Sequence, residues 1–145
     1  MKILVINGPN LNMLGVREPD IYGSGTFTAL CRRIAEYGER HGIETEQYQS
    51  NHEGDIIDKI QEAYFNKASG VIINPGALSH YSYALRDAIS SVDIPFIEVH
   101  MSDIKNREDF RKTSVTAPVC DACIFGKGKK GYFEAIDLIL NIINK

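Results

Sequence analysis

The 145-residue sequence predicts an α/β fold in which helices cover both faces of a five-stranded parallel sheet. Two observations lead to this prediction. Short apolar runs alternate with amphipathic stretches along the chain, and those stretches repeat apolar residues with the period of an α-helix. Parallel strands joined by helices need right-handed crossovers. We therefore expect a doubly wound, flavodoxin-like sheet with the strand order 2-1-3-4-5.

The expected strands are apolar runs with the length of a strand, each bounded by polar, glycine or proline residues. They lie at residues 3–7, 43–49, 70–74, 95–100 and 122–126. No linker, internal repeat or low-complexity segment separates them. We therefore expect one catalytic domain that spans residues 1–145.

The expected helices lie at residues 26–41, 55–67, 79–92 and 131–144. Apolar residues on one face support the second helix (Ile56, Ile60, Ala63 and Tyr64) and the last helix (Ile136, Ile139, Leu140 and Ile143). Gly42 is expected to end the first helix, and Ser69-Gly70 the second. A shorter helical piece is expected at 107–112, between the fourth and fifth strands.

The composition excludes several classes of protein. Hydrophobic residues make up 43% and charged residues 24%, as in an ordinary globular domain. A net charge of -3 provides no basic field for nucleic acid, and the apolar runs are far too short to span a membrane. The N-terminus has the pattern of a strand and lacks a signal-peptide cleavage site. The 3 cysteines, an odd number, fit a reducing compartment, so we expect a cytoplasmic protein.

Two short motifs match functional signatures in their residues, but the sequence around them does not fit those functions. Cys120 and Cys123 form a C-x-x-C, but no second pair follows to complete a zinc site, and Cys123 leads into an apolar run instead of a helix. We expect buried or incidental thiols. Residues 126–131 spell G-x-G-x-x-G, but no further strand and acidic residue follow, as dinucleotide binding requires. We expect a tight strand-to-helix turn there.

Polar residues gather where the predicted strands end, in the segments 7–23, 49–54, 74–80 and 98–102. Ligands of doubly wound folds bind at the carboxyl ends of the strands, so these segments are the predicted site. The first segment is long for a loop in a compact domain, and we expect it to be an ordered lid.

The residue types in these segments argue against several chemistries. His52, His80 and His100 come from separate loops without metal-ligand spacing, so no metal is expected. No lysine in the four segments could form a Schiff base, and Ser102 lies in no G-x-S-x-G elbow. The expected chemistry therefore depends on imidazole, guanidinium, amide and phenol groups, without a cofactor.

The motifs in these segments resemble those of the type II 3-dehydroquinate dehydratases over essentially the whole chain. They are Asn-Gly-Pro-Asn-Leu-Asn…Leu-Gly…Arg-Glu-Pro…Ile-Tyr-Gly at 7–23, Gln-Ser-Asn-His-Glu-Gly at 49–54, Asn-Pro-Gly-Ala at 74–77, Ala-Leu-Arg-Asp-Ala at 84–88 and Glu-Val-His at 98–100. The resemblance implies a lyase of the shikimate pathway of aromatic amino-acid biosynthesis. Such an enzyme dehydrates 3-dehydroquinate to 3-dehydroshikimate through an enolate.

The resemblance also implies catalytic roles. Tyr22 would take the proton from C2, and Arg17 would favour its phenolate form. Asn12 would help to stabilise the enolate, through a water. His100 would protonate the departing hydroxyl, and Glu98 would orient His100. A ketone α-proton needs such a base, and the enolate needs a place for its charge.

The implied substrate-binding residues resemble family positions that hold different parts of the substrate. Asn74, His80 and Arg111 would hold the ring hydroxyls, and the backbone at Met101 and Ser102, with the Ser102 hydroxyl, would hold the carboxylate. Asp87 would reach the site of a neighbouring subunit, in a homododecamer built as a tetramer of trimers.

An alternative from another functional class is a flavodoxin-like binding module that holds FMN or a small effector without turnover. It would have the same fold, because a fold does not fix a function. A bound flavin would make the purified protein yellow, whereas the dehydratase would be colourless.

Overall fold

The computed structural model describes residues 1–16 and 25–145. Its five strands form one parallel sheet with the order β2-β1-β3-β4-β5, which confirms the predicted order. The strands are β1 (Lys2–Asn7), β2 (Glu44–Gln49), β3 (Gly70–Asn74), β4 (Phe96–His100) and β5 (Ala122–Phe125). Each lies within a residue of its predicted run or matches it.

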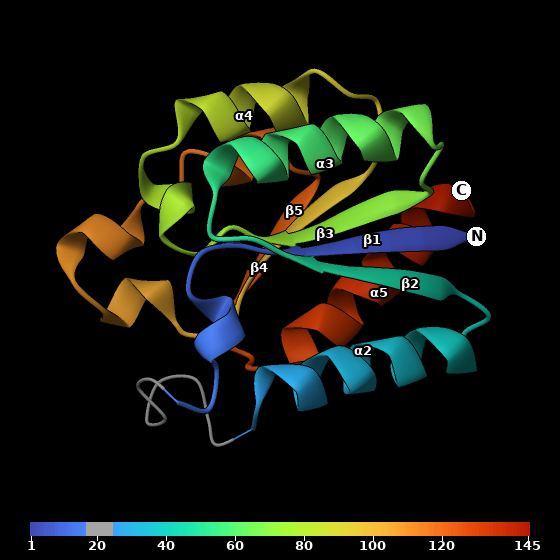
Figure 1. Cartoon of the computed structure of the whole chain (residues 1–145), viewed down its shortest axis with the longest axis horizontal. Coiled ribbons are helices and arrows are strands. Elements are labelled where there is room, and N and C mark those ends of the chain that lie inside the picture. Colours follow the sequence, from blue (N-terminus) through green and yellow to red (C-terminus); the bar gives the residue numbers. More distant parts are fainter. Residues whose placement is uncertain (17–24) are drawn as a thin grey trace.

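In the part of the chain that the structure describes, four α-helices cover the sheet, and they lie on both of its faces (Figure 1). Helices α3 (Glu53–Phe65) and α4 (Tyr83–Ser90) lie on one face, and α2 (Phe27–Arg40) and α5 (Lys130–Ile143) on the other. This arrangement confirms the doubly wound α/β prediction. None of the described helices is long and apolar enough to cross a membrane.

Shorter 3-10 helices occupy the segments that follow the strands. They are η1 (Leu11–Met13), η2 (Gly76–His80), η3 (Ile104–Asn106), η4 (Asp109–Lys112) and η5 (Ala117–Val119). Figure 1 shows η1 and the two orange turns after β4 at the end of the sheet opposite the two termini. The helical piece expected at 107–112 is thus the 3-10 helix η4, with η3 before it.

Each strand divides its side chains between two hydrophobic cores, because successive residues of a strand point to opposite faces. Val5 of β1 and Ile72 of β3 join the core under α2 and α5, whereas Phe96 of β4 joins the core under α3 and α4. By the same alternation Asn74, at the end of β3, turns toward α5. His100, at the end of β4, turns toward the opposite face.

The predicted start of the helix at 79–92 is wrong, because α4 begins at Tyr83. Residues 76–80 form η2, and α4 begins only after Ser82, whose Oγ accepts a hydrogen bond from the Leu85 amide across 3.0 Å. This serine cap satisfies an amide of the first turn and so sets the start of the helix. The predicted ends of the other three helices agree within two residues.

Two further details of the predicted helices differ. Helix α3 ends at Phe65, before the expected Ser69-Gly70, and Lys67 beyond it adopts a left-handed φ of 58°. Tyr64 is 47% exposed and does not share the buried face of Ile56 and Ile60. The expected stop after α2 is confirmed, since Gly42 has a φ of 73°.

The glycine-rich segment after β5 forms the expected tight turn. Gly126 and Gly128 have φ values of 78° and 57°, a conformation that favours glycine. Their amides donate hydrogen bonds to the carbonyl oxygens of Ser102 and Met101, each across 3.0 Å. The turn therefore fixes the backbone that follows β4.

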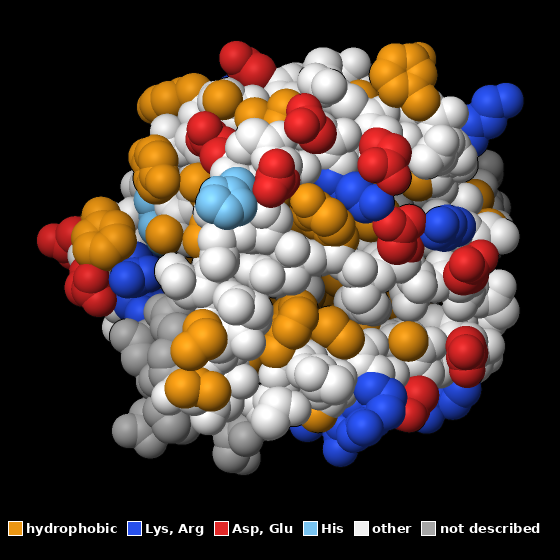
Figure 2. All heavy atoms as spheres, in the orientation of Figure 1, with side chains coloured by type: hydrophobic (Ala, Val, Ile, Leu, Met, Phe, Trp, Pro, Cys, Tyr) orange, Lys and Arg blue, Asp and Glu red, His pale blue; other side chains and the backbone are white. Residues whose placement is uncertain are grey.

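The surface of the molecule carries charges of both signs. Figure 2 shows acidic and basic side chains together on one face, and no charge of a single sign covers that face.

Candidate active site

A cavity of about 100 Å³ lies at the carboxyl ends of β1, β3 and β4. Its walls come from the segments that follow these strands, as the parallel sheet predicts. Six residues predicted for the site line it: Asn74, His80, His100, Met101, Ser102 and Arg111. The fold thus brings these six residues together, although Asn74 and Arg111 are 37 positions apart in the sequence.

Two other predicted residues, Asn12 and Asp87, do not line this cavity. Asn12, on η1, accepts a hydrogen bond from Gln49 across 3.4 Å and is not among the residues that line this cavity. Asp87 is exposed on α4 and also lies outside the cavity wall. Arg17 and Tyr22 lie outside the described residues, so their predicted roles stay predictions.

His100 is held by a buried carboxylate. Its Nε2 lies 2.7 Å from Oε2 of Glu98, and the two residues are 6% and 0% exposed. They lie two positions apart on β4, so their side chains share one face of the sheet. Glu98 also accepts hydrogen bonds from Ser114, across 2.7 Å, and from Thr116.

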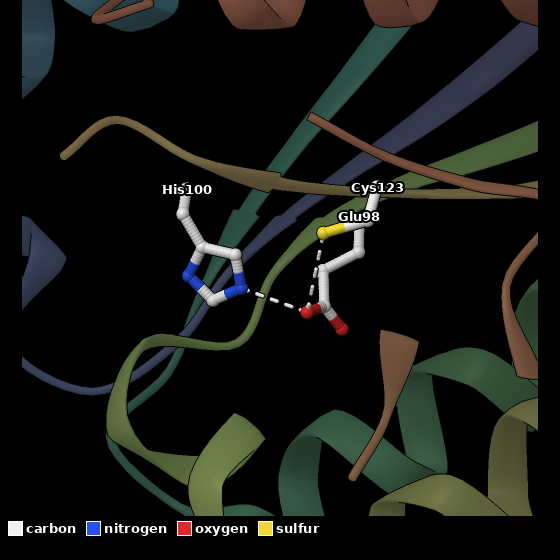
Figure 3. A group of neighbouring side chains, drawn as sticks. All are labelled: Glu98, His100 and Cys123. Atoms are coloured by element: carbon white, nitrogen blue, oxygen red, sulfur yellow. Dashed lines mark hydrogen bonds and ion pairs between the residues drawn. The ribbon is translucent and has the colours of Figure 1, made fainter. Parts of the chain in front are cut away.

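The hydrogen bonds keep Glu98 ionised. Burial by itself would raise the pKa of this carboxyl, but the hydrogen bond and charge of His100, with the Thr116 and Ser114 hydroxyls, outweigh burial and hold the pKa below its usual value. A carboxylate only accepts hydrogen bonds, so Nε2 of His100 carries a proton and donates it. The other ring nitrogen, Nδ1, points away from Glu98 (Figure 3).

His80 is fixed as a hydrogen-bond acceptor toward the cavity. Its Nδ1 lies 2.8 Å from the carbonyl oxygen of Thr113, and because a carbonyl accepts, Nδ1 carries the proton. Burial lowers the pKa of His80, so the ring is neutral at neutral pH and Nε2 keeps its lone pair. A substrate hydroxyl is a fitting donor to this nitrogen.

Asn74 is positioned by a buried tyrosine. Its Nδ2 donates to the phenolic oxygen of Tyr132 on α5 across 3.0 Å, and its Oδ1 accepts from the Gly76 amide across 3.2 Å. Tyr132 is 0% exposed and donates its own proton to Asn7. Burial raises the pKa of Tyr132, so it acts as a neutral hydrogen-bonding group. These contacts leave one proton of Nδ2 for a ligand in the cavity.

Two arginines bring positive charge to the wall of the cavity. Nη1 of Arg107 donates to Oγ of Ser102 across 3.4 Å, and Nε of Arg111 lies 3.4 Å from Glu108. Guanidinium groups suit a carboxylate ligand, because their N–H groups match its two oxygens. The roles implied by the resemblance included Arg111 but not Arg107. The sequence feature that could have identified Arg107 is its position shortly after the fourth strand, where ligands of this fold bind.

Three further residues of the site also had no assigned role. Ser114 and Thr116 lie in the loop before η5, and their hydroxyls look ordinary in the sequence. Tyr132 lies among the apolar residues of α5 and looks like a core residue. Only their hydrogen bonds to Glu98 and Asn74 reveal them.

Glu98, His100 and Cys123 are the described residues that come together as potential metal ligands, with all ligand atoms within 4.8 Å of one another. This group differs from both metal sites that the sequence suggested, the three histidines at strand ends and the C-x-x-C of Cys120 and Cys123. Cys120 and Cys123 are partly buried, as expected, and burial raises the pKa of both thiols, that of Cys123 to about 12. Both thiols are therefore protonated at neutral pH.

Comparisons with known proteins agree with one another. A family model described as "Dehydroquinase class II" matches residues 1–140. The 3-dehydroquinate dehydratase of Lachnospira eligens is 55% identical over 146 residues, covering 100% of this chain and 99% of that protein. The 3-dehydroquinate dehydratase of Clostridium acetobutylicum is 54% identical over 145 residues, which cover 100% of this chain and 100% of that protein. The crystal structure of type II dehydroquinase from Butyrivibrio crossotus matches with a TM-score of 0.96 and 60% identity over 97% of each chain.

Proposed function

The chain belongs to the class II dehydroquinase family and is a dehydratase of 3-dehydroquinate, and we propose that it forms 3-dehydroshikimate through an enolate intermediate. This membership confirms the resemblance found in the sequence. The observation that carries the proposed mechanism is the cavity at the carboxyl edge of the sheet. It joins a buried His100–Glu98 pair to polar groups from separate loops.

The first step breaks the bond between C2 of the substrate and its proton. Tyr22, as phenolate, accepts this proton, and the electron pair moves toward the neighbouring ketone to give the enolate. Arg17 favours the phenolate by its charge. Asn12 stabilises the enolate oxygen through a water, since developing negative charge needs a positioned donor.

The second step breaks the bond between C1 and its hydroxyl. The electron pair of the enolate forms the new C1–C2 double bond, and His100 gives the leaving oxygen a proton so that it departs as water. Glu98 supports this role because its hydrogen bond to Nε2 fixes the orientation of the imidazole. Side chains thus carry the reaction without metal or cofactor.

The substrate is held by groups of opposite character at different parts of the cavity. His80 and Asn74 bind ring hydroxyls, the first as acceptor and the second as donor, and Arg111 adds a charged donor. The backbone at Met101 and Ser102, with the Ser102 hydroxyl, binds the carboxylate. The contact between Arg107 and Ser102 supports this placement of negative charge.

We propose that residues 1–145 act as one flavodoxin-like catalytic domain in a homododecamer built as a tetramer of trimers. Asp87 supports assembly by its exposure on α4, away from the cavity of its own chain. We place the enzyme in the cytoplasm and in the shikimate pathway. The three free cysteines fit a reducing compartment.

A direct assay tests the reaction. The product is a conjugated enone, so purified protein mixed with 3-dehydroquinate should raise the ultraviolet absorbance. Heat-denatured protein is the control, and His100→Ala should give almost no rise. Folded protein that leaves the absorbance unchanged would contradict the proposal. The alternative of a flavin-binding module predicts a yellow protein and no turnover, and the same sample distinguishes it.

A further inference from the structure

We propose that Glu98, His100 and Cys123 form an inhibitory binding site for one thiophilic divalent cation, zinc above all. The register of the sheet creates this group. Glu98 on β4 lies opposite Cys123 on β5, and His100 follows Glu98 by two positions on the same face. Figure 3 shows the three side chains pointing toward one another.

The distances fit a small tetrahedral ion after slight movement. Oε2 of Glu98 lies 2.7 Å from Nε2 of His100 and 3.9 Å from Sγ of Cys123, and all three ligand atoms lie within 4.8 Å of one another. Bonds of about 2.0–2.3 Å to zinc place tetrahedral ligands roughly 3.3–3.8 Å apart. The three atoms therefore need to shift by about 1 Å or less.

The chemistry of the donors selects the ion. One sulfur, one imidazole nitrogen and one carboxylate oxygen suit zinc, whereas magnesium and calcium prefer oxygen ligands alone. Three protein ligands leave a fourth position for water, as in open zinc sites. His100 lines the cavity, which gives the ion a route from solvent.

The neighbours of Glu98 prepare the site for a cation. Ser114 and Thr116 hold the carboxylate in place by hydrogen bonds from their hydroxyls. Such outer hydrogen bonds orient metal ligands and strengthen binding. On binding, the Cys123 thiol releases its proton to solvent and its sulfur bonds the ion. His100 binds through Nε2, with its ring proton moved to Nδ1.

Occupation of this site removes His100 from acid catalysis, so the ion inhibits and is not a cofactor. This consequence rests on the proposed function, whereas binding itself does not. Two separate measurements therefore follow, one of binding by spectroscopy and one of turnover.

Binding is measured by titrating the purified full-length protein with Co²⁺, which takes zinc sites and gives a sulfur-to-cobalt charge-transfer band in the near ultraviolet. The band should saturate at one ion per chain, vanish in Cys123→Ser and persist in Cys120→Ser, the matched control. Zinc should displace cobalt from the unaltered protein, so the band should fade as zinc is added. A missing band, or a band that survives in Cys123→Ser, would overturn the site.

Turnover is measured with added zinc. Zinc should inhibit the unaltered enzyme reversibly, and EDTA should restore full activity. Cys123→Ser should keep its turnover and need at least about tenfold more zinc for half inhibition, because one ligand is lost. Equal zinc sensitivity of the two proteins would refute the inhibitory site. Cobalt and zinc that bind through Cys123 without inhibition would instead contradict the proposed role of His100.

Discussion

The Nε2 atom of His100 lies 2.7 Å from the carboxylate of Glu98, two positions earlier on β4, and neither side chain is more than 6% exposed. A buried charge is costly unless it is paired and hydrogen-bonded, and Glu98 meets both conditions through His100, Ser114 and Thr116. The pair is therefore preformed, and it holds the His100 imidazole at the wall of the cavity.

Substitution of either partner should affect turnover more than substrate binding. His100→Ala should lower kcat by about 10²–10⁴, because the leaving hydroxyl loses its acid. Glu98→Gln should lower kcat by roughly 10–100-fold, since the imidazole keeps a hydrogen-bonding neighbour but loses the negative charge. Steady-state kinetics would show KM nearly unchanged. An unaltered kcat in His100→Ala would exclude it as the acid.

The free energy of unfolding should fall in acid through Glu98. Its pKa in the folded chain is below the ordinary value of 4.5, so the stabilisation is present above pH 4.5 and is lost as the pH falls through the folded-state pKa. Urea unfolding at a fixed chain concentration, between neutral pH and pH 3, would measure this loss. Glu98→Gln should show a shallower pH dependence. If the unfolding free energies of the two proteins changed equally with pH, carboxyl groups other than Glu98 would account for the loss of stability in acid.

Tyr22 and Arg17 should act as a base and its tuning charge. Tyr22→Phe should keep substrate binding but remove nearly all turnover, because the proton acceptor is gone. Arg17→Gln should lower the rate and move the rising limb of the pH profile upward, toward the ordinary phenol pKa of about 10. Rate measurements across alkaline pH test this. An unchanged rate and profile in Arg17→Gln would show that another group tunes the base.

Tyr132→Phe should destabilise the protein and weaken substrate binding, although Tyr132 lies on α5 beneath the cavity. The variant loses the proton donated to Asn7 and the oxygen that accepts from Asn74, and each buried group left unpaired costs about 1–3 kcal/mol. Chemical denaturation and KM would measure the two effects. Tyr64→Phe, at a 47% exposed position, is the matched control and should change stability by less than about 0.5 kcal/mol.

Asp87 should matter for assembly. Light scattering of the active protein should give about twelve times the chain mass, as a closed symmetric oligomer of this kind requires. Asp87→Ala should weaken the assembly or lower activity, whereas Asp58→Ala, at another exposed acid on α3, should do neither. A fully active monomer would disprove the assembly and leave Asp87 with a local role on α4.

Much of the site followed from the sequence because parallel strands end at one edge of the sheet. Asn74, His100 and Ser102 lie at or just after strand ends, so the predicted topology already placed them together. Ser82 shows where this reasoning failed. Its hydroxyl caps α4, and the apolar pattern that begins before it extended the predicted helix too far.

The sequence by itself determined which segments form strands and helices, because hydrophobic periodicity is a local property. The strand order, the covered faces and the edge that holds the cavity followed from these segments and from the right-handed crossovers of parallel sheets. Tertiary structure alone decided the partners across the sheet. Tyr132 meets Asn74 because α5 packs on β3, and Cys123 meets Glu98 because of the register of β5 on β4. Such contacts join residues far apart in the chain, and only packing brings their polar atoms within hydrogen-bonding distance.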